Sequence, residues 1–374
     1  MSRSQSCLVA IERQVAFQLG DYRKLKSTLA AAVEQEAWRR SSLFGVVDVD
    51  RMTVHPSDKW SGLSFDASKE RGQQWSYSSV GGNSKGYRNS DFLSSVFAHG
   101  LNANAAFDMQ DSVSSTESPL PVFQFNRMSR AVNAILWPLK GFHDIGDERF
   151  AGSGIVDKLS FGQKEASLFW RGALVGHSLV NGKKKNIQFV VKDYIEGKIS
   201  RDDMLSHLET LPRFRFVRDN FGKAGFNVGF VFPKRLSYFR EIKEIDALTL
   251  DFVRREDQLN FRYLMQISGN DWATSFPWHS ETNSLVIRES YPWEAFYDCH
   301  FHPWYHYLPV AGGFSHLDQI LTWAESNADT CEEIVSRAQE SSRVIADGEL
   351  RAEILSRVVD VYNKTYAAEK GGFS

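Results

Sequence analysis

Short apolar runs alternate with helical patterns over the second half of the chain. Two segments, Asp202–Leu211 and Leu317–Glu325, carry apolar residues at helical spacing. The runs between and around them have the length of buried strands and are Ser167–Trp170, Gly225–Phe232, Tyr263–Ile267, Leu285–Ile287 and His306–Val310. This alternation predicts an α/β fold with a parallel sheet. Ligands of such sheets bind at the carboxyl ends of the strands.

The remaining elements are less regular. Asp21–Arg40 has the spacing and the capping residue of a helix, and Ala105–Met109 and Pro121–Phe125 have the pattern of strands. Ser57–Ser90 fits a meander or an ordered loop. A helix is also expected to begin over Trp293–Tyr297. Two more helices are expected between residues 331 and 366, separated at Gly348.

Length and glycine clusters suggest how the chain is divided. With 374 residues the chain exceeds the size at which single cores stop growing, about 250–300 residues, so two domains are expected. Glycine and serine cluster between Gly152 and Gly162. We therefore expect one domain over residues 1–155, a second over residues 156–342, and helices over residues 343–374 that return to the first domain.

Charge and cysteine content exclude several classes of protein. The formal net charge is −2, which removes the overall basic field of a nucleic-acid binder. The three cysteines, Cys7, Cys299 and Cys331, form no close pair, which argues against a disulfide scaffold or a thiolate zinc site and fits a reducing compartment. No apolar stretch reaches the ~18–20 residues that span a bilayer. A cytoplasmic location is the expectation.

Three strand ends carry polar residues that suit a diphosphate. The first strand ends in Arg171-Gly172, which offers a guanidinium for phosphate oxygens and a close backbone approach. The next opens into Gly269-Asn270-Asp271, where free N–H groups of a following helix would attract an anion. A third ends in Arg288, and Glu294 on the helix after it could accept hydrogen bonds from a ribose diol.

Each of these segments also has a simpler interpretation. Arg171 could be a surface residue at a strand end, the Gly-Asn-Asp turn could only cap a helix, and Glu294 could be solvated. Their succession at equivalent positions of one sheet is what favours a nucleotide site. Trp272 and Trp278 lie close enough in sequence to the glycine turn to stack on a base or a sugar.

Other motifs are weaker. Asp48-Val49-Asp50 has the form of a metal-binding DxD, but this pattern is common by chance. His300, His302 and His306 resemble a metal cluster, although packing is the better interpretation. The basic run over residues 183–185 is expected to be a solvated turn, and it leaves a peripheral membrane contact open.

The stretch from Phe261 to Val310 resembles the signature region of glycosyltransferase family 90. The upstream Phe169-Trp170-Arg171-Gly172 is similar to an aromatic-Arg-Gly motif of that family, and the residues from Pro121 to Arg127 are similar to the segment before it. The Gly-Asn-Asp-x-Ala-Thr sequence at residues 269–274 looks most like the bacterial lipopolysaccharide branch. The resemblance spans residues 105–323.

The resemblance implies a GT-B fold, in which two Rossmann-like domains face one another with a nucleotide-sugar between them and no metal or other cofactor is used. It implies inversion at C1, with a carboxylate of the first domain as general base. Asp111 matches that position. Gln110 precedes it where eukaryotic members have Arg, which leaves Asp108 as a rival.

On the donor side, the resemblance implies that the leaving diphosphate is neutralised by a set of second-domain residues. Eukaryotic members often have an Arg at the position of Ser275, so Arg288 or Arg262 would replace it. The expected donor-binding residues are Arg171, Gly172, Gly269, Asn270, Asp271, Ser275, Arg288 and Glu294.

The sequence therefore predicts an inverting, metal-independent glycosyltransferase. Its donor would be a UDP-sugar, and its acceptor a hydroxyl of a saccharide or glycolipid in lipopolysaccharide synthesis. No nucleic-acid partner is expected. Two alternatives stay open. One is a protein O-glycosyltransferase of the same family, and the other is a degenerate, non-catalytic binding subunit, which Ser275 and the altered base motif favour.

Overall fold

The computed structural model of the chain describes residues 5–21, 43–56, 63–68, 74–79, 85–111, 117–139 and 156–366. The helix predicted over Asp21–Arg40 lies outside the described residues from position 22 onward, and so do residues 152–155 of the predicted boundary. The chain divides into two compact units. The first consists of Met1–Gly146, Pro292–His300 and Val344–Ser374, and the second of Asp147–Tyr291 and Phe301–Arg343. Both contain parallel strands and helices, which confirms the α/β class.

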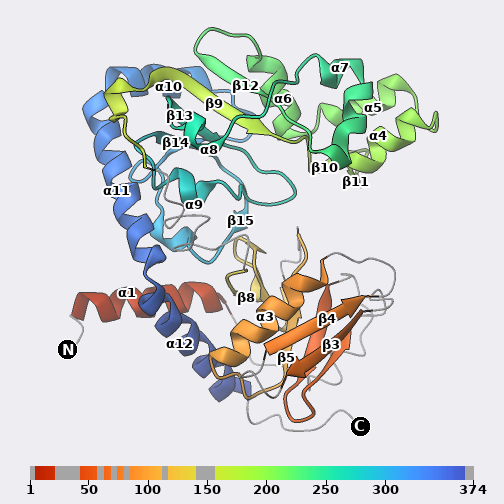
Figure 1. Cartoon of the computed structure of the whole chain (residues 1–374), viewed down its shortest axis with the longest axis vertical. Helices are drawn as coiled ribbons and strands as arrows, with labels where there is room; N and C mark the ends of the chain where they lie inside the picture. The colour runs from red at the N-terminus through yellow and green to blue at the C-terminus, as the bar shows by residue number, and fades with distance from the viewer. Residues whose placement is uncertain are drawn as a thin grey trace. The chain divides into compact units, whose positions relative to one another are not determined.

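The second unit is built on a five-stranded parallel sheet. Its strand order is β12-β9-β13-β14-β16, and each neighbouring pair is parallel (Figure 1). The strands are β9 (Glu165–Gly172), β12 (Phe226–Phe230), β13 (Phe261–Gln266), β14 (Leu285–Glu289) and β16 (Leu308–Val310). Because all five run in one direction, their carboxyl ends share one edge of the sheet.

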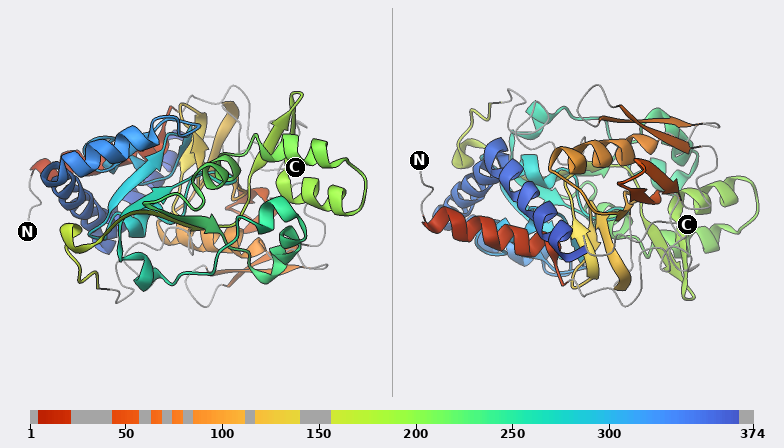
Figure 2. Two further views of the ribbon diagram at one scale, coloured as in Figure 1. Left: turned by 90° about the horizontal axis from the view of Figure 1, so that it is seen from above. Right: turned by 90° about the horizontal axis from the view of Figure 1, so that it is seen from below.

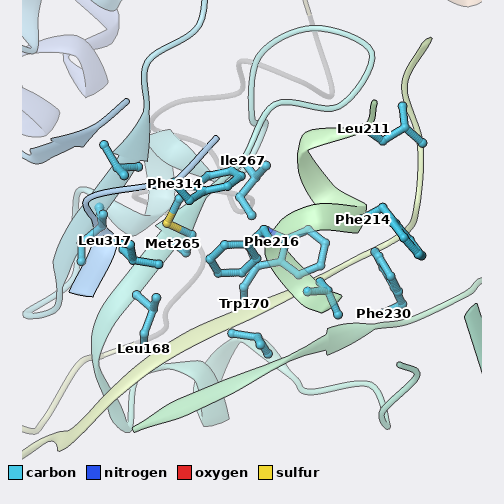
Figure 3. Close-up of a cluster of buried hydrophobic side chains, with 14 of the residues drawn as sticks. Leu168, Trp170, Leu211, Phe214, Phe216, Phe230, Met265, Ile267, Phe314 and Leu317 are labelled. Carbon is cyan, nitrogen blue, oxygen red and sulfur yellow. The ribbon is translucent and has the colours of Figure 1, made fainter. Parts of the chain in front are cut away.

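A single large core covers one face of this sheet. Tyr263, Met265 and Ile267 alternate with residues of the opposite face and enter this core, as the period of two in a strand requires. Helix α6 (Pro212–Asn220) begins with Pro212 in its first turn and buries Phe214, Phe216 and Val217. Figure 3 shows Phe214 and Phe216 of α6 packed beside Trp170 of β9. This packing brings the start of α6 to the carboxyl edge.

The other elements of the second unit surround this sheet. They are the hairpin β10 (His177–Val180) and β11 (Lys183–Asn186), the helices α4 (Ile187–Ile195), α5 (Arg201–Leu208), α7 (Lys243–Asp246), α8 (Arg255–Gln258), α9 (Phe276–His279), α10 (Leu317–Ser326) and α11 (Ala328–Ala346), and the 3₁₀ turns η2 (Phe161–Gln163) and η3 (Lys234–Glu241). Helix α5 begins with a capping box between Ser200 and Asp203. Helix α11 ends before Gly348, where the sequence predicts a break.

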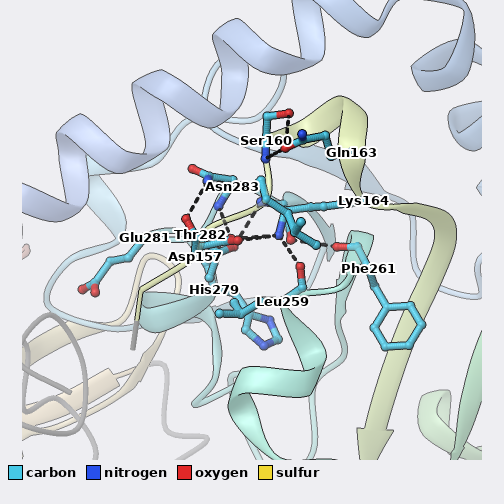
Figure 4. Close-up of polar contacts among 12 residues, drawn as sticks. Asp157, Ser160, Gln163, Lys164, Leu259, Phe261, His279, Glu281, Thr282 and Asn283 are labelled. Carbon is cyan, nitrogen blue, oxygen red and sulfur yellow. Dashed lines mark hydrogen bonds and ion pairs between the residues drawn. The ribbon is translucent and has the colours of Figure 1, made fainter. Parts of the chain in front are cut away.

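A buried ion pair fastens the amino edge of the same sheet. The Lys164 ammonium lies 2.8 Å from Oδ2 of Asp157 and also donates to the carbonyl of Leu259. Asp157 Oδ2 accepts a second hydrogen bond from the Asn283 N–H, at 2.7 Å. Figure 4 shows this network, which joins the segment before β9 to the turns that precede β13 and β14.

The first unit has a mixed sheet of its own, in the order β2-β1-β5-β6-β8. Strand β1 is antiparallel to both of its neighbours, whereas β5, β6 and β8 are parallel. The strands are β1 (Phe44–Asp48), β2 (Thr53–Pro56), β5 (Ala105–Asp108), β6 (Glu117–Gln124) and β8 (Val132–Leu136). A separate hairpin of β3 (Leu63–Ser68) and β4 (Gln74–Ser79) lies within the segment expected to be a meander or a loop.

Among the described residues, three α-helices accompany this sheet. Helix α3 (Gly86–Ala98) buries Phe92, which packs against Phe107 and Phe123 of the sheet. Helices α1 (Gln5–Leu19) and α12 (Gly348–Tyr366) lie side by side (Figure 2). Tyr362 of α12 contacts the ring of Phe123 at a centroid distance of 4.9 Å, so α12 joins the core of this sheet.

Candidate functional site

The strand ends singled out in the sequence share the carboxyl edge of the second unit's sheet. Gly172 at the end of β9 pairs with Phe230 at the end of β12, and Gln266 at the end of β13 pairs with Arg288 near the end of β14. The loop that follows β13 therefore leaves the sheet between the ends of β9 and β14. The parallel register thus brings the three predicted segments to one edge, as the alternation of elements implied.

The loop over Ile267–Asp271 differs from the predicted phosphate cradle. The helix expected to follow Asp271 directly does not begin until Phe276, it has four residues, and Pro277 lies in its first turn. The N–H of Gly269 donates to the Asp271 carbonyl at 3.1 Å, and that of Ser268 donates to a side chain. The prediction of a helix that begins directly after Asp271 is therefore wrong, and the N–H groups of Ser268 and Gly269 have partners within the protein.

Glu289 holds one side of this loop. Its Oε2 accepts hydrogen bonds from both the N–H and the hydroxyl of Ser268, each at 2.8 Å. The side chain is buried, and this burial raises the pKa of Glu289. Glu289 was not among the predicted site residues, although its position at the end of a buried strand was a usable signal.

Arg213 of α6 holds the other side of the loop. Its Nε donates to the Ser268 carbonyl at 2.9 Å, and its Nη2 to the Ile267 carbonyl at 3.2 Å. The third bond runs from Nη1 to the Ala173 carbonyl, just after β9, at 2.9 Å. Burial lowers the pKa of Arg213 to about 10. No motif indicated this role, because Arg213 lies in a helix far from the predicted site residues in the sequence.

Packing accounts for two of the predicted glycines. A Cβ on Gly269 would lie 2.8 Å from Nη2 of Arg213, and one on Gly172 would lie 2.7 Å from the ring of Trp170. Any side chain at either position would displace a neighbour. Glycine is thus required here by the close approach of buried groups, whatever binds at the edge.

The guanidinium of Arg171 has partners on the neighbouring segments. Nη1 and Nη2 donate to the backbone carbonyl and the side-chain oxygen of Asn227, at 2.8 and 2.6 Å. Nε donates to the Asp251 carbonyl at 3.3 Å, and the group lies 5.2 Å from the centroid of the Phe169 ring. Burial lowers the pKa of Arg171. Arg171 is at the carboxyl edge, as predicted. Its guanidinium N–H groups also join β9 to β12 through Asn227.

Arg288 lies in an aromatic enclosure. Its guanidinium carbon is 4.5 Å from the Phe276 ring centroid, 4.9 Å from that of Tyr291 and 5.4 Å from that of Tyr307. Its Nε donates to the Tyr291 hydroxyl at 3.1 Å. Such an enclosure fixes a cation at the end of β14. Arg262, the other candidate for this role, is at the amino end of β13 and pairs with Glu325 at 3.0 Å. Arg262 is therefore at the amino edge of the sheet, opposite the edge where Arg171 and Arg288 lie.

Ser275 belongs to a buried chain of hydrogen bonds. Its hydroxyl donates to Oε1 of Gln266 at 2.8 Å, and the amide of Gln266 bonds to Nδ1 of His279. Burial lowers the pKa of His279 to about 3, so the ring is neutral at physiological pH. This chain ties the segment before α9 to the end of β13. The two tryptophans of this region, Trp272 and Trp278, are both buried.

In the first unit, Asp108 is the last residue of β5, and Asp111, the base that the sequence predicts, lies three residues further on. Asp111 Oδ1 lies 2.6 Å from Nη1 of Arg88, and its Oδ2 lies 3.4 Å from Nζ of Lys85. Burial alone raises the pKa of Asp111, but the two cations outweigh it, and the net pKa is lowered. Asp108 is more buried, and its Oδ1 accepts the N–H of Gln110 at 3.1 Å in a local turn.

The segment around Glu294 is extended. Trp293–Glu294 forms strand β15, which pairs antiparallel with β7 (Arg127–Met128), so the prediction of a helix here is wrong. Asp298 Oδ2 accepts the N–H of Ala295 and closes a turn directly after the strand. Glu294 belongs to the first unit, and its Oε2 lies 2.9 Å from Nε of Arg127.

The weaker motifs have identifiable contacts. The N–H of His302 donates to Nδ1 of His306 at 2.8 Å, and Nε2 of His306 bonds to the Ser341 hydroxyl. Asp48 accepts the N–H of Arg51. In the part of the chain that the structure describes, no three His, Cys, Asp or Glu side chains are grouped so that they could hold a metal ion. Nor does any described helix have the length and apolarity to cross a membrane.

Comparison with known proteins finds a match for the region that contains part of this edge, the ends of β13, β14 and β16. Residues 237–349 match the family model for glycosyl transferase family 90. The matched segment is less than a third of the chain. It includes the loop after β13, Arg288 and the aromatic enclosure, and it confirms the resemblance seen in the sequence.

Relatives of known activity are similar over a comparable length. The rat protein O-glucosyltransferase 3 is 25% identical over 87 residues, which are 23% of this chain and 17% of the relative. O-glucosyltransferase LpsA of Dichelobacter nodosus is 26% identical over 91 residues, or 24% of this chain and 29% of the relative. The mouse protein O-glucosyltransferase 1 is 29% identical over 84 residues, which are 22% of this chain and 21% of the relative. The similarity thus spans less than a third of each relative.

Proposed function

We propose that the chain is a glycosyltransferase that moves a sugar from a nucleoside diphosphate to a hydroxyl acceptor. The family 90 match over residues 237–349 carries this proposal, because it includes the carboxyl ends of three of the five strands of the parallel sheet, β13, β14 and β16. Open α/β sheets bind nucleotides at that edge. The O-glucosyltransferase names of the relatives make UDP-glucose the first donor to test.

The reaction we propose is a single displacement with inversion. Asp111 takes the proton of the acceptor hydroxyl while that oxygen forms its bond to C1 of the sugar, and the C1–O bond to the diphosphate breaks with its electron pair leaving on UDP. A base must be ionised to act. The pairing with Arg88 and Lys85 supports Asp111 in this role, since it favours the carboxylate. Asp108 is the rival, but its turn hydrogen bond and burial make it the weaker candidate.

On the donor side, we propose that Arg171, Arg288 and the loop Gly269–Asp271 surround the diphosphate, with Gly172 and Ser275 beside them. Two cations fixed at strand ends on either side of β13 would offset the charge that develops on the leaving group. We keep the prediction that Glu294 accepts hydrogen bonds from the ribose hydroxyls. Its ion pair with Arg127 would orient the carboxylate. We further propose a metal-independent GT-B enzyme that acts in the cytoplasm.

Two acceptor classes are compatible with the relatives. The similarity to LpsA and the bacterial form of the loop favour a saccharide acceptor of the lipopolysaccharide type. The similarity to protein O-glucosyltransferases favours a protein hydroxyl instead. Radiolabelled UDP-glucose offered with lipopolysaccharide oligosaccharides in one reaction and with a protein extract in another would separate them. Label in the saccharide fraction supports the first acceptor class, and label in protein supports the second.

The test of catalysis is release of UDP from a panel of UDP-sugars. Asp111→Asn should abolish release and leave UDP binding intact, because the carboxamide cannot accept the proton. Asp66→Asn is the matched control, since Asp66 is an exposed carboxylate on the β3–β4 hairpin of the same unit. UDP binding without turnover by the wild-type protein would favour the non-catalytic alternative. Full activity of Asp111→Asn would move the base role to Asp108.

A further inference from the structure

The loops after β9 and β13 are in direct contact at the carboxyl edge. Gly176 has a φ of +129°, a conformation that favours glycine, and a Cβ placed there would lie 3.1 Å from the Gly269 carbonyl oxygen. These are the same loops that follow Arg171 and precede Ser275. Any shift of one loop is therefore transmitted to the other.

Arg213 joins these two loops from α6. Its guanidinium accepts no hydrogen bonds and donates three, to the carbonyls of Ala173, Ile267 and Ser268 at 2.9, 3.2 and 2.9 Å. A planar fork can reach three acceptors in fixed directions, which a lysine ammonium at the end of a flexible stem does not reproduce.

The loop is held from its opposite side as well. Ser268 donates its N–H and its hydroxyl to Glu289 while its carbonyl accepts from Arg213. Both peptide groups that flank Ser268 are thus fixed by buried charged side chains. Preorganisation of this kind lowers the cost of ordering a loop when a ligand binds.

We propose that Arg213 is the positioning residue of the donor site, fixing the loops after β9 and β13 in the arrangement that binds the nucleoside diphosphate. This inference rests on the proposed function. Arg213 itself would not contact the nucleotide-sugar, because its N–H groups are directed at backbone carbonyls. Misplacement of a binding group by about 1 Å can cost up to about a hundredfold in rate or affinity.

The experiment compares UDP affinity in three variants by isothermal titration calorimetry. Arg213→Met removes all three hydrogen bonds and should weaken UDP binding between about ten- and a hundredfold. Arg213→Lys retains the charge and part of the bonding, so its affinity should be intermediate. Lys164→Met is the matched control, because it also removes a buried cation bonded to a backbone carbonyl, but at the amino edge of the same sheet. Its UDP affinity should stay within about twofold of wild type.

The outcomes separate the inference from the function on which it rests. Absence of UDP binding by the wild-type protein would contradict the proposed uridine donor and the inference with it. Wild-type binding with equal affinities in Arg213→Met and Lys164→Met would overturn only the role of Arg213. If Arg213→Met does not fold, Arg213→Lys decides the question through steady-state kinetics. The KM for the UDP-sugar should then rise severalfold while the KM for the acceptor stays unchanged, and an unchanged donor KM contradicts the role.

Discussion

Replacement of Lys164 by methionine should destabilise the second unit strongly. The ammonium is fully buried, lies 2.8 Å from the largely buried Asp157, and donates to the Leu259 carbonyl. Burial lowers the pKa of Lys164, and Asp157 opposes that shift. Methionine has a similar volume but leaves the Asp157 carboxylate without its cation. The expected loss is that of an uncompensated buried charge.

The structure sets the size of this effect. Breaking a buried ion pair by removing one partner costs about 3–5 kcal/mol. Asp157 keeps its hydrogen bond from the Asn283 N–H, so we expect the lower end, about 3 kcal/mol. With a urea dependence of about 2–3 kcal/mol/M, the midpoint of unfolding should fall by about 1 M.

Urea unfolding followed by tryptophan fluorescence measures this shift. The double variant Lys164→Met/Asp157→Asn removes both charges and keeps an oxygen for Asn283. It should regain at least about 1 kcal/mol relative to Lys164→Met alone, because no buried charge is then left unpaired. A single variant within about 1 kcal/mol of wild type, or a double variant less stable than the single one, would refute the reasoning.

Three further predictions follow from the described contacts. Arg88→Gln should move the acidic limb of the pH profile of kcat/KM to higher pH by about 1 unit, because the lost cation no longer lowers the pKa of Asp111. An acidic limb at the wild-type pH would contradict the role of Arg88. Burial raises the pKa of Glu281 from 4.5 to about 7, so the folded state favours its neutral form and stability should fall as pH rises through that window. Urea unfolding at both ends of the window should show a smaller fall for Glu281→Gln, and an unchanged fall would assign it to other groups. Gly269→Ala, whose Cβ would lie 2.8 Å from a guanidinium nitrogen, should cost about 1–3 kcal/mol in thermal unfolding, whereas Gly162→Ala, with open space around it, should cost little. Equal losses for the two glycine variants would contradict the overpacking.

The sheet of the second unit was predictable because its strands are short apolar runs separated by helices. Trp170, Met265 and Ile287 each enter the core from a strand that the pattern identified. Parallel pairing then places the strand ends together without further information. Asp111 was identified from a family motif. Its partner Arg88 could not be predicted in the same way, because Arg88 lies on a helix 23 residues earlier in the chain.

The errors have a common physical origin in long-range contacts. Glu294 was expected on a helix, but pairing with Arg127, 167 residues earlier, makes the segment a strand. The Gly269 turn was interpreted as a phosphate cradle, whereas its neighbours Arg213 and Glu289 already use part of its backbone. Local propensity carries no information on partners so distant in the chain.

The first unit is assembled from three stretches of chain, and this has a consequence for the order in which the protein is made. Its core includes Tyr362, whose hydroxyl donates to the Asn104 carbonyl, and Asn363, whose amide donates to the Gly100 carbonyl. A ribosome synthesises these partners about 260 residues apart, roughly 13–50 seconds at 5–20 residues per second. Throughout that interval the surface of the first unit that α12 covers is exposed. Newly made chains are therefore expected to need protection from aggregation until α12 emerges.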